Sequence, residues 1–125
     1  MTGDAYSVIS EQYRRESRER MIVPLPKGFY TECALYIDTL SNRATAMRDS
    51  GSTDGDDYSE LMERLMAVNR LVSDLRRIRM EKISRMAMFA ASGGVPDTSP
   101  LSEDELELFR SYRDSAKRHL GKVLG

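Results

Sequence analysis

The stretch from Tyr58 to Ala91 runs for more than thirty residues without a glycine or a proline. Apolar residues recur along it at spacings of three and four, which is typical of an amphipathic helix. Most helices in proteins owe their stability to packing of the apolar face, and a chain of 125 residues has little other sequence to cover so long a face. The stretch therefore predicts a scaffold helix that packs against partner helices, and it favours an assembly subunit over an enzyme.

Three further helices are predicted around this one, so the expected fold class is all-α: a bundle of four main helices with one long central helix. The first runs from about Asp4 to Arg20 and the second from Lys27 to Asp49. The last begins at Ser102 or Glu103 and is expected to fray after about His119. The apolar face of the second helix comprises Phe29, Cys33, Tyr36, Ile37, Leu40, Ala44 and Met47.

The breaks between the helices have recognisable chemistry. Residues 21–26 contain two prolines and predict an extended connector, whereas residues 50–56 and 92–100 combine glycine with small polar residues and predict loops. Asp57 is a plausible N-cap for the long helix. Ser102 followed by Glu105 forms a capping box, which gives the start of the last helix a clear signature.

Composition narrows the possible functions. Nineteen basic and twenty acidic residues leave a net charge of -1, so the chain as a whole has no bias toward nucleic acid or anionic membranes. The lone Cys33 excludes an internal disulfide and a multi-cysteine metal site. We see no export signal and no apolar run of transmembrane length, so a cytoplasmic location without a membrane partner is expected.

Catalytic chemistry has little support in the sequence. The only histidine, His119, lies among basic residues near the end of the last helix and is interpreted as solvent-facing. Cys33 lies on an apolar helix face, where a thiol behaves as a small inert hydrophobe. The acidic cluster at residues 54–57 lacks the spacing of a calcium loop. We therefore predict no catalytic residue, no cofactor and no metal site.

A locally basic segment lies in the second half of the long helix. Residues 76, 79, 82 and 85 step by three and so drift around the helix axis by about 60° at each step, which predicts that some point toward other helices. The favoured interpretation is ion pairing with Glu16, Glu19, Glu32 or Asp38; contact with DNA phosphates or a protein partner stays open. The basic patch candidates are Arg76, Arg77, Arg79, Lys82 and Arg85.

Three short motifs occur in order along the chain. Leu25-Pro26 followed by Phe29-Tyr30 opens the second helix, Ile78-Arg79 followed by Lys82-Ile83 lies in the central helix, and Glu107-Leu108-Phe109 lies in the last. Together they make the chain resemble the helical A domain of archaeal GINS subunits. The resemblance covers nearly the whole sequence, and it depends on the order and spacing of the motifs.

The resemblance implies a non-catalytic assembly subunit of a GINS-like DNA replication complex, which links or stimulates the replicative minichromosome-maintenance helicase at the chromosome. Its implied partners are other GINS subunits in a homo- or hetero-tetramer and a RecJ-like nuclease homologue, with weak or no direct nucleic-acid binding. Residues 1–125 would form a single helical domain, of the subunit type in which this A domain precedes a small β-rich B domain that the sequence does not contain.

Subunits of this kind share apolar residues between the core and the subunit interfaces. The alternative hypothesis is a small helical DNA-binding or regulatory module that uses Arg76 to Arg85 on phosphates. The candidates for core and subunit interface are Tyr13, Phe29, Tyr36, Leu61, Leu65, Val68, Leu75, Ile78 and Ile83.

Overall fold

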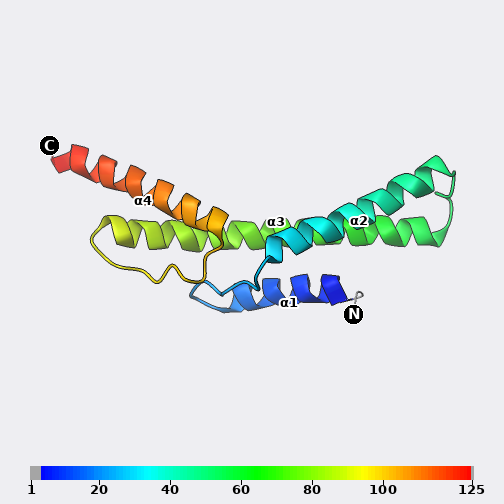
Figure 1. The fold of residues 1–125 in the computed structure, drawn as a ribbon, viewed down its shortest axis with the longest axis horizontal. Helices are drawn as coiled ribbons and strands as arrows, with labels where there is room; N and C mark the ends of the chain where they lie inside the picture. Colours follow the sequence, from blue (N-terminus) through cyan, green and yellow to red (C-terminus); the bar gives the residue numbers. More distant parts are fainter. Residues whose placement is uncertain (1–3, 125) are drawn as a thin grey trace. The chain divides into compact units, whose positions relative to one another are not determined.

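A computed structural model describes residues 4–124, and every regular element in that range is an α-helix. The helices are α1 (Asp4–Arg18), α2 (Phe29–Asp49), α3 (Asp56–Ala91) and α4 (Glu103–Leu124), as Figure 1 shows. With 36 residues, α3 is the longest. The predicted all-α fold with one long helix is therefore confirmed. Among the described helices, none has the length and apolar character that crossing a membrane requires.

The chain divides into two compact units, and α3 contributes residues to both. Unit 1 takes its described residues from Met1–Arg14 and Pro26–Leu75, and unit 2 takes its from Arg15–Leu25 and Arg76–Gly125. The unit boundaries fall within α1 and α3, so neither unit corresponds to one continuous piece of sequence. The prediction of one helical domain over residues 1–125 stays a prediction.

Unit 1 is built on an antiparallel pair of helices. In Figure 1, α2 leads through a short loop into α3, which returns alongside it. The loop contains Gly51, whose φ of 74° lies in the left-handed region that a glycine adopts without strain. Burial of the facing apolar side chains stabilises the pair, by about 1.5–3 kcal/mol for each large one. The buried hydrophobic residues of this unit are Ile9, Phe29, Cys33, Leu40, Ala44, Leu61, Val68 and Leu75.

Unit 2 has its own apolar cluster, formed where α4 meets the second half of α3. Ile22 from the connector, Ile83 and Ala87 from α3, and Phe109 from α4 are buried together. Two partly buried leucines, one on each side of the Ser102 cap, pack against this cluster, as expected for a hydrophobic staple. The partly buried residues around the cluster are Met86, Ala90, Leu101, Leu106, Leu108 and Tyr112.

Two helix boundaries near the connector differ from the prediction. α1 ends at Arg18, two residues early, because the backbone carbonyls of Glu16 and Glu19 bind the Lys82 ammonium group, at 2.8 and 2.9 Å. α2 begins at Phe29 and not at Lys27, because Gly28 adopts a left-handed conformation with a φ of 70° that cannot continue a right-handed helix.

Two further boundaries differ on the distal helices. α3 begins at Asp56, so Asp57 lies inside the first helical turn and not at the predicted N-cap, where its carboxylate still complements the positive helix end. α4 continues to Leu124, so the predicted fraying after about His119 is wrong. Gly121 lies within this last stretch, and a single exposed glycine costs a helix only about 1 kcal/mol relative to alanine.

Candidate assembly surface

Arg79 is the centre of a buried ion-pair network in unit 2. Its side chain is fully buried, and its guanidinium group donates to Glu16 Oε1 at 2.6 Å and to both carboxylate oxygens of Glu105 at 2.7 and 2.8 Å. It also donates to the backbone carbonyls of Val23 and Pro100. One α3 side chain thus binds α1, the connector, the loop before α4 and the first turn of α4.

Lys82 completes the network from the same face of α3, since residues three apart on a helix are neighbours. Its ammonium group lies 2.7 Å from Glu16 Oε2 and also donates to the carbonyl of Met21 at 3.1 Å. The same Glu16 oxygen also holds the connector, because the Val23 N–H donates to Oε2 at 3.1 Å. The connector therefore has a fixed path although it contains no helix.

The network balances two cations against two carboxylates. Burial by itself lowers the pKa of the Arg79 guanidinium, but its hydrogen bonds and charge interactions with Glu105 and Glu16 outweigh burial and raise the pKa above the ordinary value. Among the described residues, no buried side-chain nitrogen or oxygen lacks a hydrogen-bond partner. A buried network stabilises a unique arrangement only when all its members are satisfied, and this one meets that condition.

The structure divides the predicted basic patch. Arg79 and Lys82 are buried, whereas Arg76, Arg77 and Arg85 are exposed. The expected pairing with Glu16 is found, and Glu19 takes part through its carbonyl oxygen. Glu32 and Asp38, the other expected partners, are not among the described partners of Arg79 or Lys82. A phosphate-binding surface over residues 76–85 would therefore lack its two central charges.

Sequence reasoning missed the role of Glu105. The predicted capping box is present, because the Ser102 N–H donates to Glu105 Oε1 at 3.0 Å and the Glu105 N–H donates to Ser102 Oγ at 3.3 Å. The same carboxylate also pairs with Arg79. The cap already accounted for a glutamate at this position, so the sequence held no separate signal for the ion pair.

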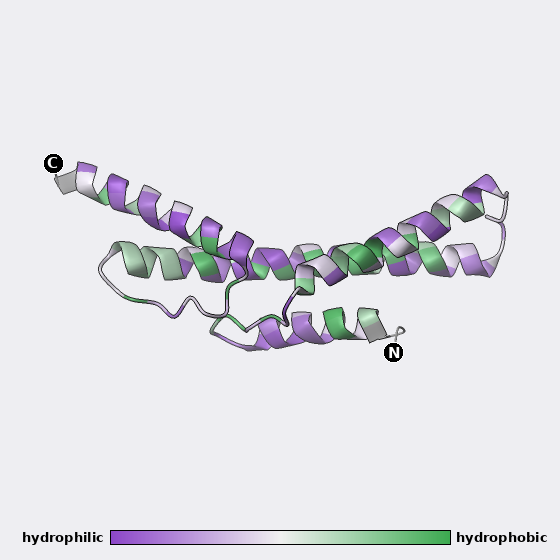
Figure 2. Ribbon diagram, viewed as in Figure 1, coloured by the Kyte–Doolittle hydropathy of each residue, from purple (hydrophilic) through white to green (hydrophobic). Residues whose placement is uncertain are grey.

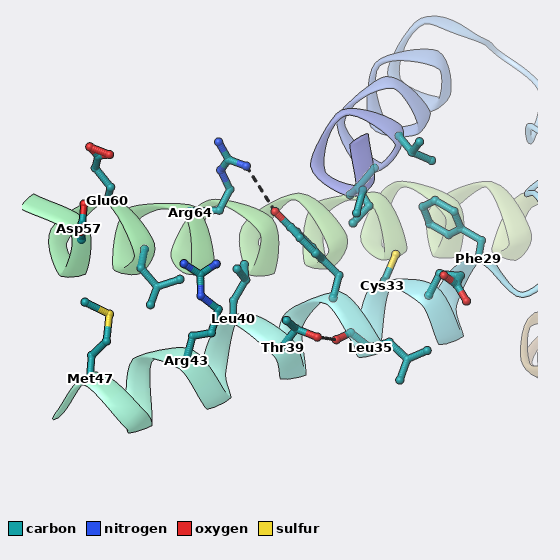
Figure 3. Close-up of a pocket in the computed structure, with 16 residues that line it drawn as sticks. Phe29, Cys33, Leu35, Thr39, Leu40, Arg43, Met47, Asp57, Glu60 and Arg64 are labelled. Atoms are coloured by element: carbon teal, nitrogen blue, oxygen red, sulfur yellow. Dashed lines mark hydrogen bonds between the residues drawn. The ribbon is translucent and has the colours of Figure 1, made fainter. Parts of the chain in front are cut away.

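Unit 1 carries an open groove of about 1070 Å³ between its part of α1, α2 and the first half of α3 (Figure 3). Phe29, Cys33 and Leu40 contribute buried side chains to its wall, while Val8 and Leu35 remain half exposed. The charged residues that line the groove are Glu32, Arg43, Asp57, Glu60 and Arg64. An apolar floor with charges of both signs around it is suited to a protein partner more than to a small polar substrate.

Arg64 orders the aromatic side chains beside the groove. Its guanidinium lies 4.4 Å from the centre of the Tyr6 ring, in a cation–π contact. It also donates to the Tyr36 hydroxyl at 3.4 Å, and Figure 3 marks this bond by the dashed line from Arg64. The hydrogen bond to Tyr36 is the main reason why the pKa of Arg64 is raised. Tyr36, a predicted interface residue, is thus held at the groove with part of its surface open.

The nine predicted core or interface residues fall into two classes. Phe29, Leu61, Val68, Leu75 and Ile83 are buried within the chain itself, which makes them core residues. The others keep partial exposure and so retain surface for a partner: Tyr13, Tyr36, Leu65 and Ile78. Further hydrophobic side chains in unit 1 are more exposed than these, and sequence reasoning did not single them out: Val8, Leu35 and Met66.

Side chains that could bind a metal ion are not clustered within the described residues. No group of three or more histidine, cysteine, aspartate or glutamate side chains that could hold a metal ion occurs among residues 4–124. Cys33, the single cysteine of the sequence, is buried on α2. His119 is exposed on α4, as expected from the sequence.

Comparison with protein families places this chain beside a known helical domain. Residues 10–124 match the model of the Sld5 family, described as the GINS complex protein helical bundle domain. The match extends through both units, so it applies to most of the helical fold and not to one segment. Comparisons with curated proteins and with solved structures gave no significant match.

Proposed function

The chain belongs to the GINS helical-bundle family, and from this membership we propose that it serves as a non-catalytic assembly subunit that links or stimulates the replicative helicase. At the coarser level, family membership makes it a subunit of a DNA replication complex that assembles with other GINS subunits. The family match is the observation that carries the proposal, because it covers 10–124 of a 125-residue sequence.

The finer parts of the proposal go beyond the family match. The subunit would be of the archaeal type in which the helical domain precedes a β-rich domain, and it would join a homo- or hetero-tetramer. The complex would bind the minichromosome-maintenance helicase and a RecJ-like nuclease homologue at the chromosome. Its contribution would be mechanical: a rigid helical subunit that holds partners at a defined spacing, with no reaction of its own.

We assign one subunit interface to the unit 1 groove. A groove with half-exposed Val8 and Leu35 on its surface leaves apolar area in water that a helix of another GINS subunit would cover. Tyr36 offers both a ring and a hydroxyl there, and such amphipathic side chains are frequent at interfaces. Burial of the remaining surface of these residues is the expected source of the association energy.

Sedimentation velocity tests the proposal. The chain is mixed at micromolar concentration with the other GINS subunits of the same cell, and we expect a stable complex with a mass well above 14.2 kDa. Leu35→Glu, which adds a charge at the groove, should weaken association at least tenfold, because an unpaired charge would be buried. Val95→Glu is the matched control, since Val95 is 91% exposed in unit 2. A chain that stays monomeric in every mixture would refute the proposal.

A further inference from the structure

The second half of α4 carries a basic surface that no predicted site includes. Five cations lie within the thirteen residues from 110 to 122, and Asp114 is the one acidic residue among them. Arg110, Arg113 and Lys117 recur at spacings of three and four, so they share a helix face, and Arg118 and Lys122 form a second row roughly 130° further around the helix axis. Figure 2 shows α4 as a predominantly hydrophilic helix. Positive charge is therefore concentrated locally on α4, although the net charge of the chain is only -1.

These cations remain accessible, unlike those at the centre of residues 76–85. Arg110, Lys117 and Lys122 are exposed and, within residues 4–124, make no described hydrogen bond or ion pair. Arg113 is held in place, because it pairs with Asp114 at 2.9 Å and lies 5.8 Å from the centre of the Phe109 ring. Arg118 donates to Ser115 Oγ at 3.2 Å. The Asp114 carboxylate has a lowered pKa, first because of Arg113 and further because of Lys117 and Arg118, so it is charged but already paired.

The helix dipole does not account for this surface. A helix C-terminus favours cations, but the effect is limited to the last turn. Of the five cations, only Lys122 lies in the last turn of α4. The remaining four lie along the roughly three turns that precede it, where the dipole supplies no reason for them.

We propose that this basic surface of α4 binds the phosphate backbone of DNA without reading its sequence. Residues 110 to 122 span about 18 Å along the helix axis, which matches roughly five phosphates of one strand at a 3.4 Å spacing. Three of the five cations are arginines, whose planar fork suits bidentate contact with phosphate oxygens.

A polyanion fits this surface better than a protein partner does. Protein interfaces depend on buried apolar anchors, and in the described part of α4 Leu120, at 38% exposure, is the one large hydrophobic side chain that is exposed. Ser111 and Ser115 lie exposed between the cations instead. Small polar residues among cations let a nucleic-acid backbone approach closely. DNA is also what a replication-complex subunit meets, so to this extent the inference draws on family membership.

Fluorescence anisotropy with a labelled 20-base-pair duplex of mixed sequence tests the proposal over a range of salt concentrations. The wild-type chain should bind with a Kd on the order of micromolar at low salt and lose affinity steeply as salt rises. In the triple variant Arg110→Gln, Lys117→Gln, Lys122→Gln, affinity should fall roughly tenfold or more, and the slope of log K against log salt should become shallower by about 2.7. None of the three side chains makes a described hydrogen bond or ion pair, so the fold should be retained, and circular dichroism checks this.

The matched control removes three exposed cations elsewhere with the same change in net charge: Arg20→Gln, Lys27→Gln, Arg70→Gln. Its salt slope should equal that of the wild type. Absence of saturable binding at low salt, equal losses in the two triple variants, or tighter binding to labelled polyglutamate than to the duplex would each overturn the proposal. Sedimentation of the same variants separates this result from subunit assembly, because the α4 variant should enter the same complexes as the wild type.

Discussion

Arg79 on α3 and Glu105 on α4 form a bidentate pair, with Nε 2.7 Å from Oε2 and Nη2 2.8 Å from Oε1. The arginine side chain is fully buried, and the glutamate also caps its own helix through the Ser102 N–H. The Glu105 carboxylate therefore contributes both to the start of α4 and to the position of the first turn of α4 against α3. The direction and the position of α4 within unit 2 depend on the same two oxygen atoms.

Removal of the arginine should strongly destabilise the fold. Arg79→Met leaves Glu16 without one cation and Glu105 without its pair, and the loss of one member of a buried ion pair costs about 3–5 kcal/mol. We expect the free energy of unfolding in urea, followed by circular dichroism, to fall by that amount. Arg85→Met, at an exposed site on the same helix, should change it by less than about 0.5 kcal/mol. Equal unfolding midpoints for the two variants would contradict the network.

Lys82 and Glu16 should be energetically coupled. Lys82→Met removes a cation from Glu16, and Glu16→Gln removes a carboxylate from Lys82 and Arg79, so each change alone leaves the buried network with one unbalanced charge. The double variant removes one cation and one carboxylate together, so the buried charges are balanced again. Its loss of stability should therefore be smaller than the sum of the single losses by about 0.5–3 kcal/mol. Strict additivity in a double-mutant cycle would show that the 2.7 Å contact contributes nothing.

Substitutions at Ser102 and Glu105 distinguish the contribution of the helix cap to stability from that of the ion pair. Ser102→Ala removes only the side-chain cap of α4, and we expect a loss of about 1 kcal/mol. Glu105→Gln keeps the shape of the side chain but leaves the Arg79 charge with one carboxylate fewer, so the loss should be about 3 kcal/mol or more. Urea denaturation measures both values. Similar losses for the two variants would mean that Glu105 acts mainly as a cap.

The pKa of Asp97 reports on the hydrogen bonds in the loop before α4. The Ser99 N–H donates to Asp97 Oδ1 at 3.0 Å, and this bond, with one from the Ser99 side chain, holds the pKa of Asp97 below its ordinary value. A carboxyl group with a lowered folded-state pKa stabilises the fold above its unfolded pKa, and this contribution is lost as the pH falls through the folded pKa. Removal of the hydroxyl by Ser99→Ala should raise the pKa while the backbone bond keeps it below the ordinary value.

Carboxyl-detected NMR titration measures this shift residue by residue. Asp114 is the internal control, because its pKa is lowered through Arg113 and should not respond to a change at Ser99. A Ser99→Ala chain in which Asp97 titrates as in the wild type would show that the hydroxyl makes no such bond. Movement of both aspartates together would instead indicate a change in the fold.

Most of the secondary structure could be predicted, because it depends on residues a few positions apart. The period of apolar residues located the long helix to within two residues of its observed start, and the Ser102 and Glu105 pattern located the start of α4. The errors arose where the backbone departs from the average behaviour of its residue types. Gly28 delays α2 by its left-handed conformation, and contacts from Lys82 end α1 early.

The charged residues were harder to assign. The step of three between Arg79 and Lys82 did predict that some cations point inward, and Glu16 was among the expected partners. However, periodicity does not reveal which partner lies opposite a given side chain. The basic surface of α4 went unrecognised because the same run of cations is equally compatible with a solvated helix end.

The sequence by itself determined the helical class of this chain, the long α3 and the chemistry of its turns, since propensity, period and capping act over about four residues. Only the tertiary structure decided which charged side chains are buried and which residues they pair with. Arg79 finds Glu105 at a separation of 26 residues and Glu16 at 63, so these pairs exist only once the helices have packed. Burial converts two residues of an apparent surface patch into the centre of unit 2, because a desolvated charge is tolerated only beside its partner.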